Sequence, residues 1–439
     1  MLIKNYLRTH FKVFFILSIC LIGSCGNKHQ VATSKSVFIT ENDGKFQLYK
    51  NGKPYFIKGA AGHTNLKKLK EIGGNTIRTY DTLNLGSILD DAQKNGLTVM
   101  VGISLPESKY SDFVYNKPEM VAKQFQEVKQ LVNKYKDHPA ILMWCVGNEL
   151  DFSPNPKLYN FYKAFNNIVE MIHQDDPDHP VTTTMVNFYP KNLICINLFT
   201  DIDILSTNFF VSMDEMEEEL KKVHRIWKGP FIVAEWGIDG PWQIKKNAWG
   251  AQIENISHKK AERYRDMYKY LPNENPRFLG SLVFYWGAKQ EGTHTWFSMF
   301  DEKGNQSEAV GMMEYNWTGK NPEEEYPDLN DMTLDGRNAV DNIILKPGQL
   351  AEATLIISKP DTSNHTLWEI YPEDWFYAKG VKNAKRLKPV ETSFITYGYQ
   401  EANFKAPLKE GPYRIFATIY NTSGGFATCN TPFYVVANR

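Results

Sequence analysis

Eight short apolar segments recur between residues 56 and 288, and amphipathic stretches separate most of them. A continuous apolar strand is typical of a parallel sheet covered on both faces, and the intervening stretches have the period of helices. Eight such units fit a (β/α)8 TIM barrel, which usually takes about 250 residues. The expected strands are FIKGAAG from residue 56, NTIRTY from 75, TVMVGIS from 98, ILMWCVGNE from 141, VTTTMV from 181, DILSTNFF from 203, FIVAEWG from 231 and LVFYWGA from 282.

A doubly wound open sheet is the alternative α/β fold. Such a sheet normally carries a glycine-rich phosphate loop after its first strand. The corresponding segment here, GAAGHTN, is a poor match to that loop, so the pattern favours the barrel.

The segments outside the expected barrel have a different character. Turn signals NDG and NGK precede it and predict a hairpin, and short strands divided by Gly, Pro and Asn follow it. The latter indicate an immunoglobulin-like β-sandwich. The expected organisation is a signal peptide over residues 1–24, a tether over 25–35, the barrel with its hairpin over 36–320, a linker over 321–332 and the β-sandwich over 333–439.

The N-terminus has the pattern of an export signal. Lys4, Arg8 and Lys12 precede the apolar run VFFILSICLIG, which is too short to span a bilayer as a helix. The run ends in IGSC, which resembles a bacterial lipobox with Cys25 as the lipidated residue. We therefore expect an exported lipoprotein, anchored through Cys25 and located at the outer membrane.

Composition excludes some partners and cofactors. Lys plus Arg and Asp plus Glu number 50 each, so the net charge of zero gives no electrostatic case for binding nucleic acid. Cys20 would leave with the signal and Cys25 would carry lipid, so Cys145, Cys195 and Cys429 remain. Their odd number and wide spacing argue against a disulfide framework, and no paired Cys or His spacing indicates a zinc site. No metal or organic cofactor is expected.

Two of the expected strands end in glutamate. Glu149 closes the fourth strand and Glu235 closes the seventh. In a TIM barrel, catalytic groups collect at the C-terminal ends of strands, and these two ends face each other across the barrel mouth. Two opposed carboxylates are what glycosidic bond cleavage requires. Nearby, Asn148 offers an amide to a sugar hydroxyl, and Arg78, placed near Glu235, would keep that carboxylate ionised.

The set GNE at strand four, AEWG at strand seven, TIRTY at strand two and YWG at strand eight resembles glycoside hydrolase clan A. The segment NGKPYFIKGAAG with GGNTIRTYDT is similar to the catalytic barrel of family 2 and to fungal β-1,3-glucanosyltransferases. The lipid anchor and trailing sandwich resemble polysaccharide-degrading lipoproteins of Bacteroidetes, some of them endo-β-1,3-glucanases. The resemblance implies hydrolysis with retention of the anomeric configuration, with Glu149 as acid/base and Glu235 as nucleophile.

One residue departs from the clan A pattern. Members commonly place a tyrosine after strand six, where its hydroxyl bonds the nucleophile, whereas STNFF gives Asn208, Phe209 and Phe210 here. Tyr80 and Tyr285 are the two candidates to replace that hydroxyl. The remaining candidates for substrate binding lie after the strands: His63, Asn208, Trp236, Trp286, Lys289 and Trp296, with Trp242 and Trp249 as further sugar platforms.

Three functions remain open on the sequence. The first is a retaining β-glycoside hydrolase of a β-linked glycan, with endo-β-1,3-glucanase as the specific expectation. The second is a β-glucan transglycosylase on the same site, in which a sugar hydroxyl replaces water. The third is a non-catalytic glycan-binding lipoprotein.

Overall fold

The computed structural model describes residues 35–110, 112–210, 213–374, 387–391 and 394–437. The predicted signal peptide, Cys25 and nearly all of the tether lie outside these ranges. Within the described part of the chain, no helix is both long and apolar enough to cross a membrane.

Eight parallel strands close into a barrel, which confirms the predicted TIM barrel. The last strand begins at Phe278, four residues before the expected start, and the chain leaves the barrel after Val283. The strands are β4 (Ile57–Ala61), β5 (Thr76–Arg78), β6 (Thr98–Ile103), β7 (Ile141–Asn148), β8 (Val181–Val186), β9 (Ile204–Asn208), β10 (Phe231–Trp236) and β11 (Phe278–Val283).

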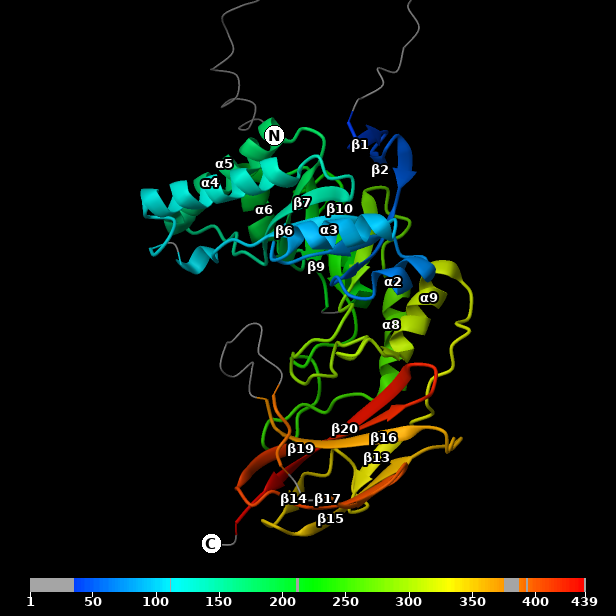
Figure 1. The fold of residues 1–439 in the computed structure, drawn as a ribbon. Coiled ribbons are helices and arrows are strands. Elements are labelled where there is room, and N and C mark those ends of the chain that lie inside the picture. Colours follow the sequence, from blue (N-terminus) through cyan, green and yellow to red (C-terminus); the bar gives the residue numbers. More distant parts are fainter. Residues whose placement is uncertain (1–34, 111, 211–212, 375–386, 392–393, 438–439) are drawn as a thin grey trace, which may run out of the picture.

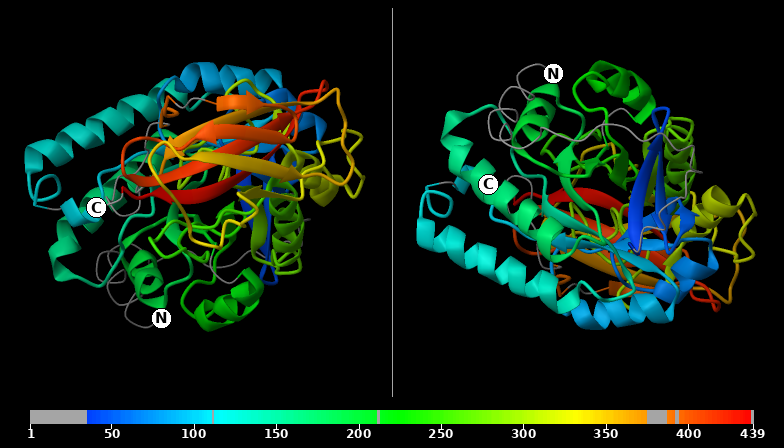
Figure 2. Two further views of the ribbon diagram at one scale, coloured as in Figure 1. Left: turned by 90° about the horizontal axis from the view of Figure 1, so that it is seen from below. Right: turned by 90° about the horizontal axis from the view of Figure 1, so that it is seen from above.

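Helices surround the barrel, as the two end-on views in Figure 2 show. Most carry one buried apolar face, as expected for a helix packed on a sheet. They are α2 (Leu66–Glu71), α3 (Leu85–Lys94), α4 (Pro118–Tyr135), α5 (Tyr159–Asp175), α6 (Pro190–Phe199), α7 (Met216–Val223), α8 (Ser257–Lys269) and α9 (Glu308–Thr318), with short 3-10 turns at Ser108–Tyr110, Pro156–Leu158 and Met213–Glu215.

A three-stranded antiparallel sheet closes the N-terminal end of the barrel. It consists of β1 (Val37–Asn42), β2 (Lys45–Lys50) and β3 (Lys53–Tyr55). Val37 and Leu48 from this sheet share one buried cluster with side chains of the barrel strands, such as Met100, Leu142 and Ile232. The predicted hairpin region therefore acts as an apolar plug.

Two further sheets follow the barrel and lie at the end opposite the plug (Figure 1). They share one buried core, with Leu334 and Phe404 from one sheet and Ile370, Ile415 and Phe433 from the other. One sheet contains β13 (Asp331–Leu334), β15 (Leu350–Ile356), β18 (Glu401–Lys405) and β17 (Phe394–Tyr397). The other contains β12 (Gln306–Ser307), β20 (Gly425–Val435), β19 (Gly411–Tyr420) and β16 (His365–Pro372), with β14 (Ile343–Leu345) beside β20.

The second of these sheets also includes residues from the barrel part of the chain. Strand β12 precedes α9, yet it pairs in parallel with Gly425 and Phe426 of β20. The C-terminal sheets are thus joined to the barrel by backbone hydrogen bonds as well as by side chains. An immunoglobulin-like topology for these sheets stays a prediction.

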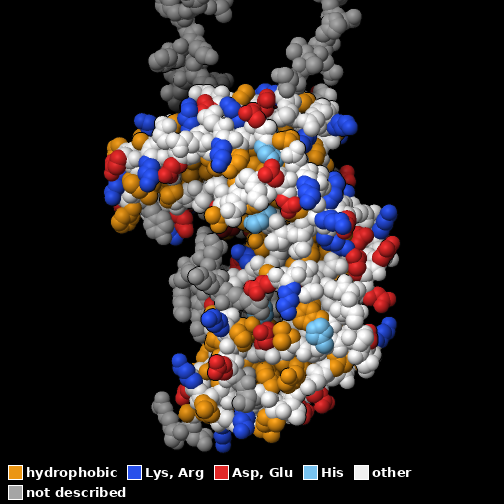
Figure 3. All heavy atoms as spheres, in the orientation of Figure 1, with side chains coloured by type: hydrophobic (Ala, Val, Ile, Leu, Met, Phe, Trp, Pro, Cys, Tyr) orange, Lys and Arg blue, Asp and Glu red, His pale blue; other side chains and the backbone are white. Residues whose placement is uncertain are grey.

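Surface charge is evenly mixed on the face shown in Figure 3, where Lys and Arg side chains alternate with Asp and Glu. This arrangement agrees with the net charge of zero. It offers no broad basic surface on that face to a polyanion.

Leu48→Ala tests the plug. Leu48 is fully buried, so the substitution should lower the free energy of unfolding by about 2–5 kcal/mol, measured by urea denaturation. Leu350→Ala makes the same change on β15 at a side chain that is 58% exposed, and should cost less than about 0.5 kcal/mol. Equal losses in the two variants would contradict the plug.

Candidate active site

A cavity of about 670 Å³ opens at the C-terminal ends of the barrel strands. Residues at or just beyond the end of all eight strands line it, as expected for the site end of a TIM barrel. The lining residues are Gly62, His63, Thr79, Tyr80, Asp81, Ile88, Ser104, Leu105, Glu107, Asn148, Glu149, Val186, Asn187, Asn208, Phe210, Glu235, Trp242, Phe284, Tyr285, Lys289, Gln290 and Glu291.

A buried guanidinium lies beneath this cavity. Arg78, at the end of β5, is 1% exposed. Its Nη1 donates to Oε1 of Glu235 at 2.8 Å and to Oδ1 of Asn208 at 3.1 Å. Its Nη2 donates to Oδ1 of Asn148 at 2.6 Å and to Oγ1 of Thr184 at 3.2 Å. One cation therefore positions side chains from four other strands.

Tyr80 supplies the hydroxyl that the sequence after strand six lacks. Its phenol donates to Oε1 of Glu235 at 2.8 Å, and the guanidinium of Arg78 lies 4.7 Å from the centre of its ring. Burial and the nearby Glu235 raise the pKa of Tyr80 well above its usual value, so the phenol stays protonated and donates. Of the two tyrosines considered, Tyr80 makes this contact, while Tyr285 lines the cavity wall.

The carboxyl of Glu235 is protonated more easily than expected. Burial raises its pKa to about 7, and the charge of Glu149 acts in the same direction. Arg78 and the hydrogen bond from Tyr80 lower the pKa but do not cancel the cost of burial. Arg78 thus lies against Glu235 and favours its ionised form, as expected, but burial outweighs this effect and raises the pKa of the carboxyl to about 7.

Glu149 stands one residue beyond β7 with a φ of 53°, in the left-handed region that a non-glycine residue rarely adopts. Gly147 also has a positive φ, of 78°. This turn brings Glu149 to the cavity, where Nδ2 of Asn208 donates to its Oε1 at 2.9 Å. Such local strain persists where the surroundings hold the residue in place, as Asn208 does here.

Four of the five predicted sugar-binding tryptophans are not among the residues that line the cavity; one of them, Trp249, packs edge-on against Tyr434 of β20. Trp236, Trp286 and Trp296 are 0%, 0% and 3% exposed, so none of them presents a ring face to a sugar. Along a strand, side chains alternate between faces, so Trp236 points away from the side that holds Glu235. It packs on Tyr264 and Tyr268, while Trp286 packs on Phe300 and Trp317, and Nε1 of Trp296 donates to the carbonyl of Asp239.

The other predicted contacts do border the cavity: His63, Tyr80, Asn148, Asn208 and Lys289. The exposed aromatic platform is Trp242, which is 45% exposed and packs edge-on against Phe210. Sequence reasoning missed Glu107 and Asn187. Both follow predicted strands closely, so their position after a strand was the signal available.

No metal-binding cluster of three or more His, Cys, Asp or Glu side chains occurs in the described ranges. The side chains at the site include carboxylates, amides, phenols, the imidazole of His63, the ammonium group of Lys289 and the buried guanidinium of Arg78.

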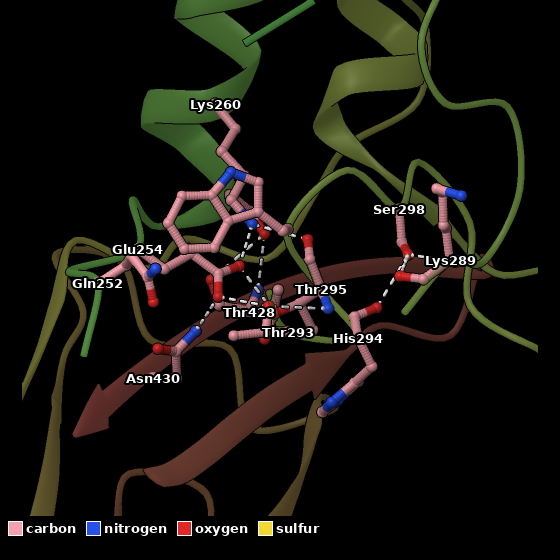
Figure 4. Close-up of polar contacts among 12 residues, drawn as sticks. Gln252, Glu254, Lys260, Lys289, Thr293, His294, Thr295, Ser298, Thr428 and Asn430 are labelled. Carbon is pink, nitrogen blue, oxygen red and sulfur yellow. Dashed lines mark hydrogen bonds and ion pairs between the residues drawn. The ribbon is translucent and has the colours of Figure 1, made fainter. Parts of the chain in front are cut away.

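A buried polar network supports the loops that form one side of the cavity (Figure 4). Glu254, which lies in the loop after β10, is 7% exposed and pairs with Lys260 of α8. Its carboxylate also accepts from the hydroxyls of Thr293 and Thr295, in the loop after β11, at 2.6 and 2.8 Å. Nδ2 of Asn430, on β20, donates to the same carboxylate at 2.7 Å.

A second ion pair extends this network into the C-terminal sheets. Arg414 of β19 pairs with Glu373 at 2.7 Å and donates to Oδ1 of Asn430 at 2.6 Å. Its Nη2 also donates to the backbone carbonyl of Gln252 at 2.8 Å. The loop after β10 is therefore hydrogen-bonded to the outer face of the β12–β20–β19–β16 sheet, and the loop after β11 is linked to that sheet through Glu254.

The sequence and the fold of the barrel resemble those of known enzymes. Residues 64–243 match the family model for the TIM barrel domain of family 2 glycosyl hydrolases. The β-glucuronidase of Rattus norvegicus is 24% identical over 237 residues, 48% of this chain and 33% of that protein. The enzyme of the same name from Streptococcus agalactiae is 24% identical over 241 residues, 46% of this chain and 39% of that protein. The chain thus spans little more than a third of the length of these relatives.

Solved structures agree in fold. A β-glucuronidase from Bifidobacterium dentium superposes with a TM-score of 0.52 at 18% identity, covering 66% of this chain and 49% of its own. A family 2 β-galacturonidase from Eisenbergiella tayi gives a TM-score of 0.52 at 15% identity, covering 66% and 54%. These comparisons support a barrel of the clan A glycoside hydrolase type, which resembles the catalytic barrel of family 2.

The buried Glu254–Lys260 pair allows a test of the loop support. Glu254→Gln leaves the Lys260 ammonium buried without its counter-charge, and should lower the free energy of unfolding by about 3–5 kcal/mol. Adding Lys260→Met removes that charge and should restore part of the loss. Urea denaturation of the two single variants and the double variant measures the coupling. Strictly additive losses would show that the two side chains do not stabilise each other.

Proposed function

We propose that this chain is a retaining β-glycoside hydrolase in which Glu235 is the nucleophile and Glu149 the acid/base. One observation carries the proposal. Glu149 and Glu235 come from strands four and seven of the barrel and line the same cavity, and only Glu235 is bonded to both Arg78 and Tyr80. A carboxylate fixed by a cation and a phenol suits a nucleophile, whereas the second carboxyl must exchange protons.

In the first step, the carboxylate of Glu235 attacks the anomeric carbon and forms a covalent glycosyl ester. The glycosidic bond breaks, and its oxygen receives the proton of Glu149. In the second step, Glu149 removes a proton from water. That water attacks the anomeric carbon and releases Glu235, so the configuration of the sugar is retained.

The neighbouring side chains fix the geometry of these steps. Both Arg78 and Tyr80 bond Oε1 of Glu235, so Oε2 is the oxygen left to attack. Asn208 donates to Oε1 of Glu149, so the transferable proton belongs on the other oxygen, Oε2. Asn148, held through its Oδ1 by Arg78, keeps its amide NH₂ group for a sugar hydroxyl.

For the sugar, we propose a β-glucuronide as the first substrate to test. The relatives named above are β-glucuronidases, so they give no support to the expectation of an endo-β-1,3-glucanase. Lys289 brings an ammonium group to the cavity, which suits a carboxylate on the substrate. It lies 3.5 Å from Glu291, and Asp81 and Glu107 also line the cavity, so a neutral glycoside is the necessary comparison.

A panel of 4-nitrophenyl β-D-glycosides tests the reaction, with glucuronide, galacturonide, glucoside, galactoside and mannoside beside laminarin. Wild-type protein should release nitrophenol from one of these sugars, and Glu235→Gln should lower kcat by at least about a thousandfold because the nucleophile is lost. Glu127→Gln, an exposed change on α4, serves as the matched control and should retain full activity. Turnover that persists in Glu235→Gln would refute the assignment, and products longer than the substrate would favour transglycosylation.

The pH dependence follows from Glu235. Since the nucleophile must be ionised and its pKa is raised to about 7, kcat/KM should fall as the pH drops through about 7. The hydrogen bond from Tyr80 lowers that pKa, so Tyr80→Phe should move the acid limb to higher pH. Tyr285→Phe, the control, should leave the limb in place whatever its effect on rate. An acid limb near pH 4 in the wild type would contradict this account.

The lipid anchor at Cys25 and the outer-membrane location stay predictions, because they concern residues outside the described ranges. Mass spectrometry of protein extracted from membranes would test them through the mass of the modified N-terminus.

A further inference from the structure

A second cavity, of about 480 Å³, lies between the loop after β11 and the sheet β12–β20–β19–β16. The mechanism above does not use it. It is lined by Ala288, Lys289, Gln290, His294, Thr295, Ser298, Phe300, Asp301, Glu302, Lys303, Leu367, Glu369, Thr418, Tyr420 and Phe426.

This cavity adjoins the catalytic cavity, since Lys289 and Gln290 line both. The backbone N–H of Lys289 donates to Oγ of Ser298 at 2.8 Å, and that hydroxyl in turn donates to the carbonyl of His294 at 2.8 Å (Figure 4). Nε2 of Gln290 donates to Oδ2 of Asp374 at 2.8 Å. The boundary between the two cavities is thus a segment of the loop after β11 that is hydrogen-bonded to the rest of that loop and to the segment after β16.

The sheet presents a regular outer face to this cavity. On β16, Trp368 and Ile370 belong to the buried core between the two sheets, so the alternating residues Leu367 and Glu369 point outward. On β19, Ala417 and Ile419 are core residues, and Thr418 and Tyr420 line the cavity. Strand periodicity therefore sets two neighbouring rows of side chains toward the loop after β11.

The side chains that line this cavity are of the kinds that bind carbohydrate. Leu367 is 42% exposed, a large apolar group at the opening, and the ring of Tyr420 lies on the neighbouring strand. Glu369 and Thr418 on the sheet, with Lys303 on the loop, provide carboxylate, hydroxyl and ammonium groups around them. A pyranose ring presents C–H groups on its faces and hydroxyls at its edge, which such a mixed lining can contact together.

We propose that this second cavity is a subsite for the further sugar units of an extended glycan whose scissile bond lies in the catalytic cavity. The inference rests on the proposed function and narrows its substrate class to a glycan chain of several units. A glycan that extends from the catalytic cavity past Lys289 and Gln290 enters the second cavity. There the C-terminal sheet contributes directly to substrate binding.

Affinity against chain length tests the proposal. Glu235→Gln protein, which should bind without turnover, is titrated by calorimetry with two oligosaccharide series of two to six units. Laminari-oligosaccharides are neutral, and hyaluronan fragments carry β-linked glucuronate. In at least one series, affinity should rise by at least about tenfold from the shortest to the longest member.

Leu367→Trp, added to Glu235→Gln, places a larger side chain at the opening of the second cavity. Because Leu367 is exposed, the fold should persist, which thermal denaturation checks. In this variant, the gain in affinity from the shortest to the longest oligosaccharide should shrink to about twofold or less. Leu350→Trp makes the same change at the exposed position on β15, a strand of the other sheet, and should keep the full gain.

Affinity that is independent of chain length in both series, or a gain that survives Leu367→Trp, would overturn the second subsite. These results are separate from the test of the proposed function, which is the loss of 4-nitrophenyl glycoside turnover in Glu235→Gln. Turnover of the chromogenic glycoside without any gain from chain length would leave a hydrolase that acts only at the catalytic cavity.

Discussion

The ion pair between Arg78 and Glu235 is the interaction on which the site depends. A guanidinium that is 1% exposed loses its hydration, so acceptors must surround it. Here the acceptors come from β7, β8, β9 and β10, and each is a residue at or near the end of its strand. The need of this one buried cation for hydrogen-bond acceptors therefore constrains where the ends of these four strands lie. It also fixes the direction in which Asn148, Asn208 and Glu235 point.

The same arrangement separates the environments of the two glutamates. Glu235 is buried and receives hydrogen bonds from a cation and a phenol, while Glu149 receives one from the neutral amide of Asn208. Asn208 connects the two, because its Oδ1 accepts from Arg78 and its Nδ2 donates to Glu149. A change at Asn208 thus alters the surroundings of both carboxylates, directly at Glu149 and through Arg78 at Glu235.

The barrel and the strand-end glutamates were predictable because burial on both faces leaves an unbroken apolar run, and because strand ends collect at one rim. The direction of an aromatic side chain beyond the end of a strand could not be predicted in this way. Trp286 lies where the chain has left β11, so no alternation rule applied, and it is core. The choice between Tyr80 and Tyr285 required the distance from β5 to β10 across the barrel, which a linear sequence does not contain. Glu254 was missed because its partners lie on α8, in the loop after β11 and on β20.

The separation of Asn430 from Glu254 by 176 residues has a consequence for biosynthesis. Glu254 and Lys260 are made first, yet Asn430 of β20 bonds the carboxylate of Glu254, and Arg414 of β19 bonds the carbonyl of Gln252. The barrel strands are all translated before these two residues exist, but the loops at the barrel mouth lack their support until β19 and β20 have been translated. Support of the loops beside the cavity therefore depends on translation of the C-terminal sheets.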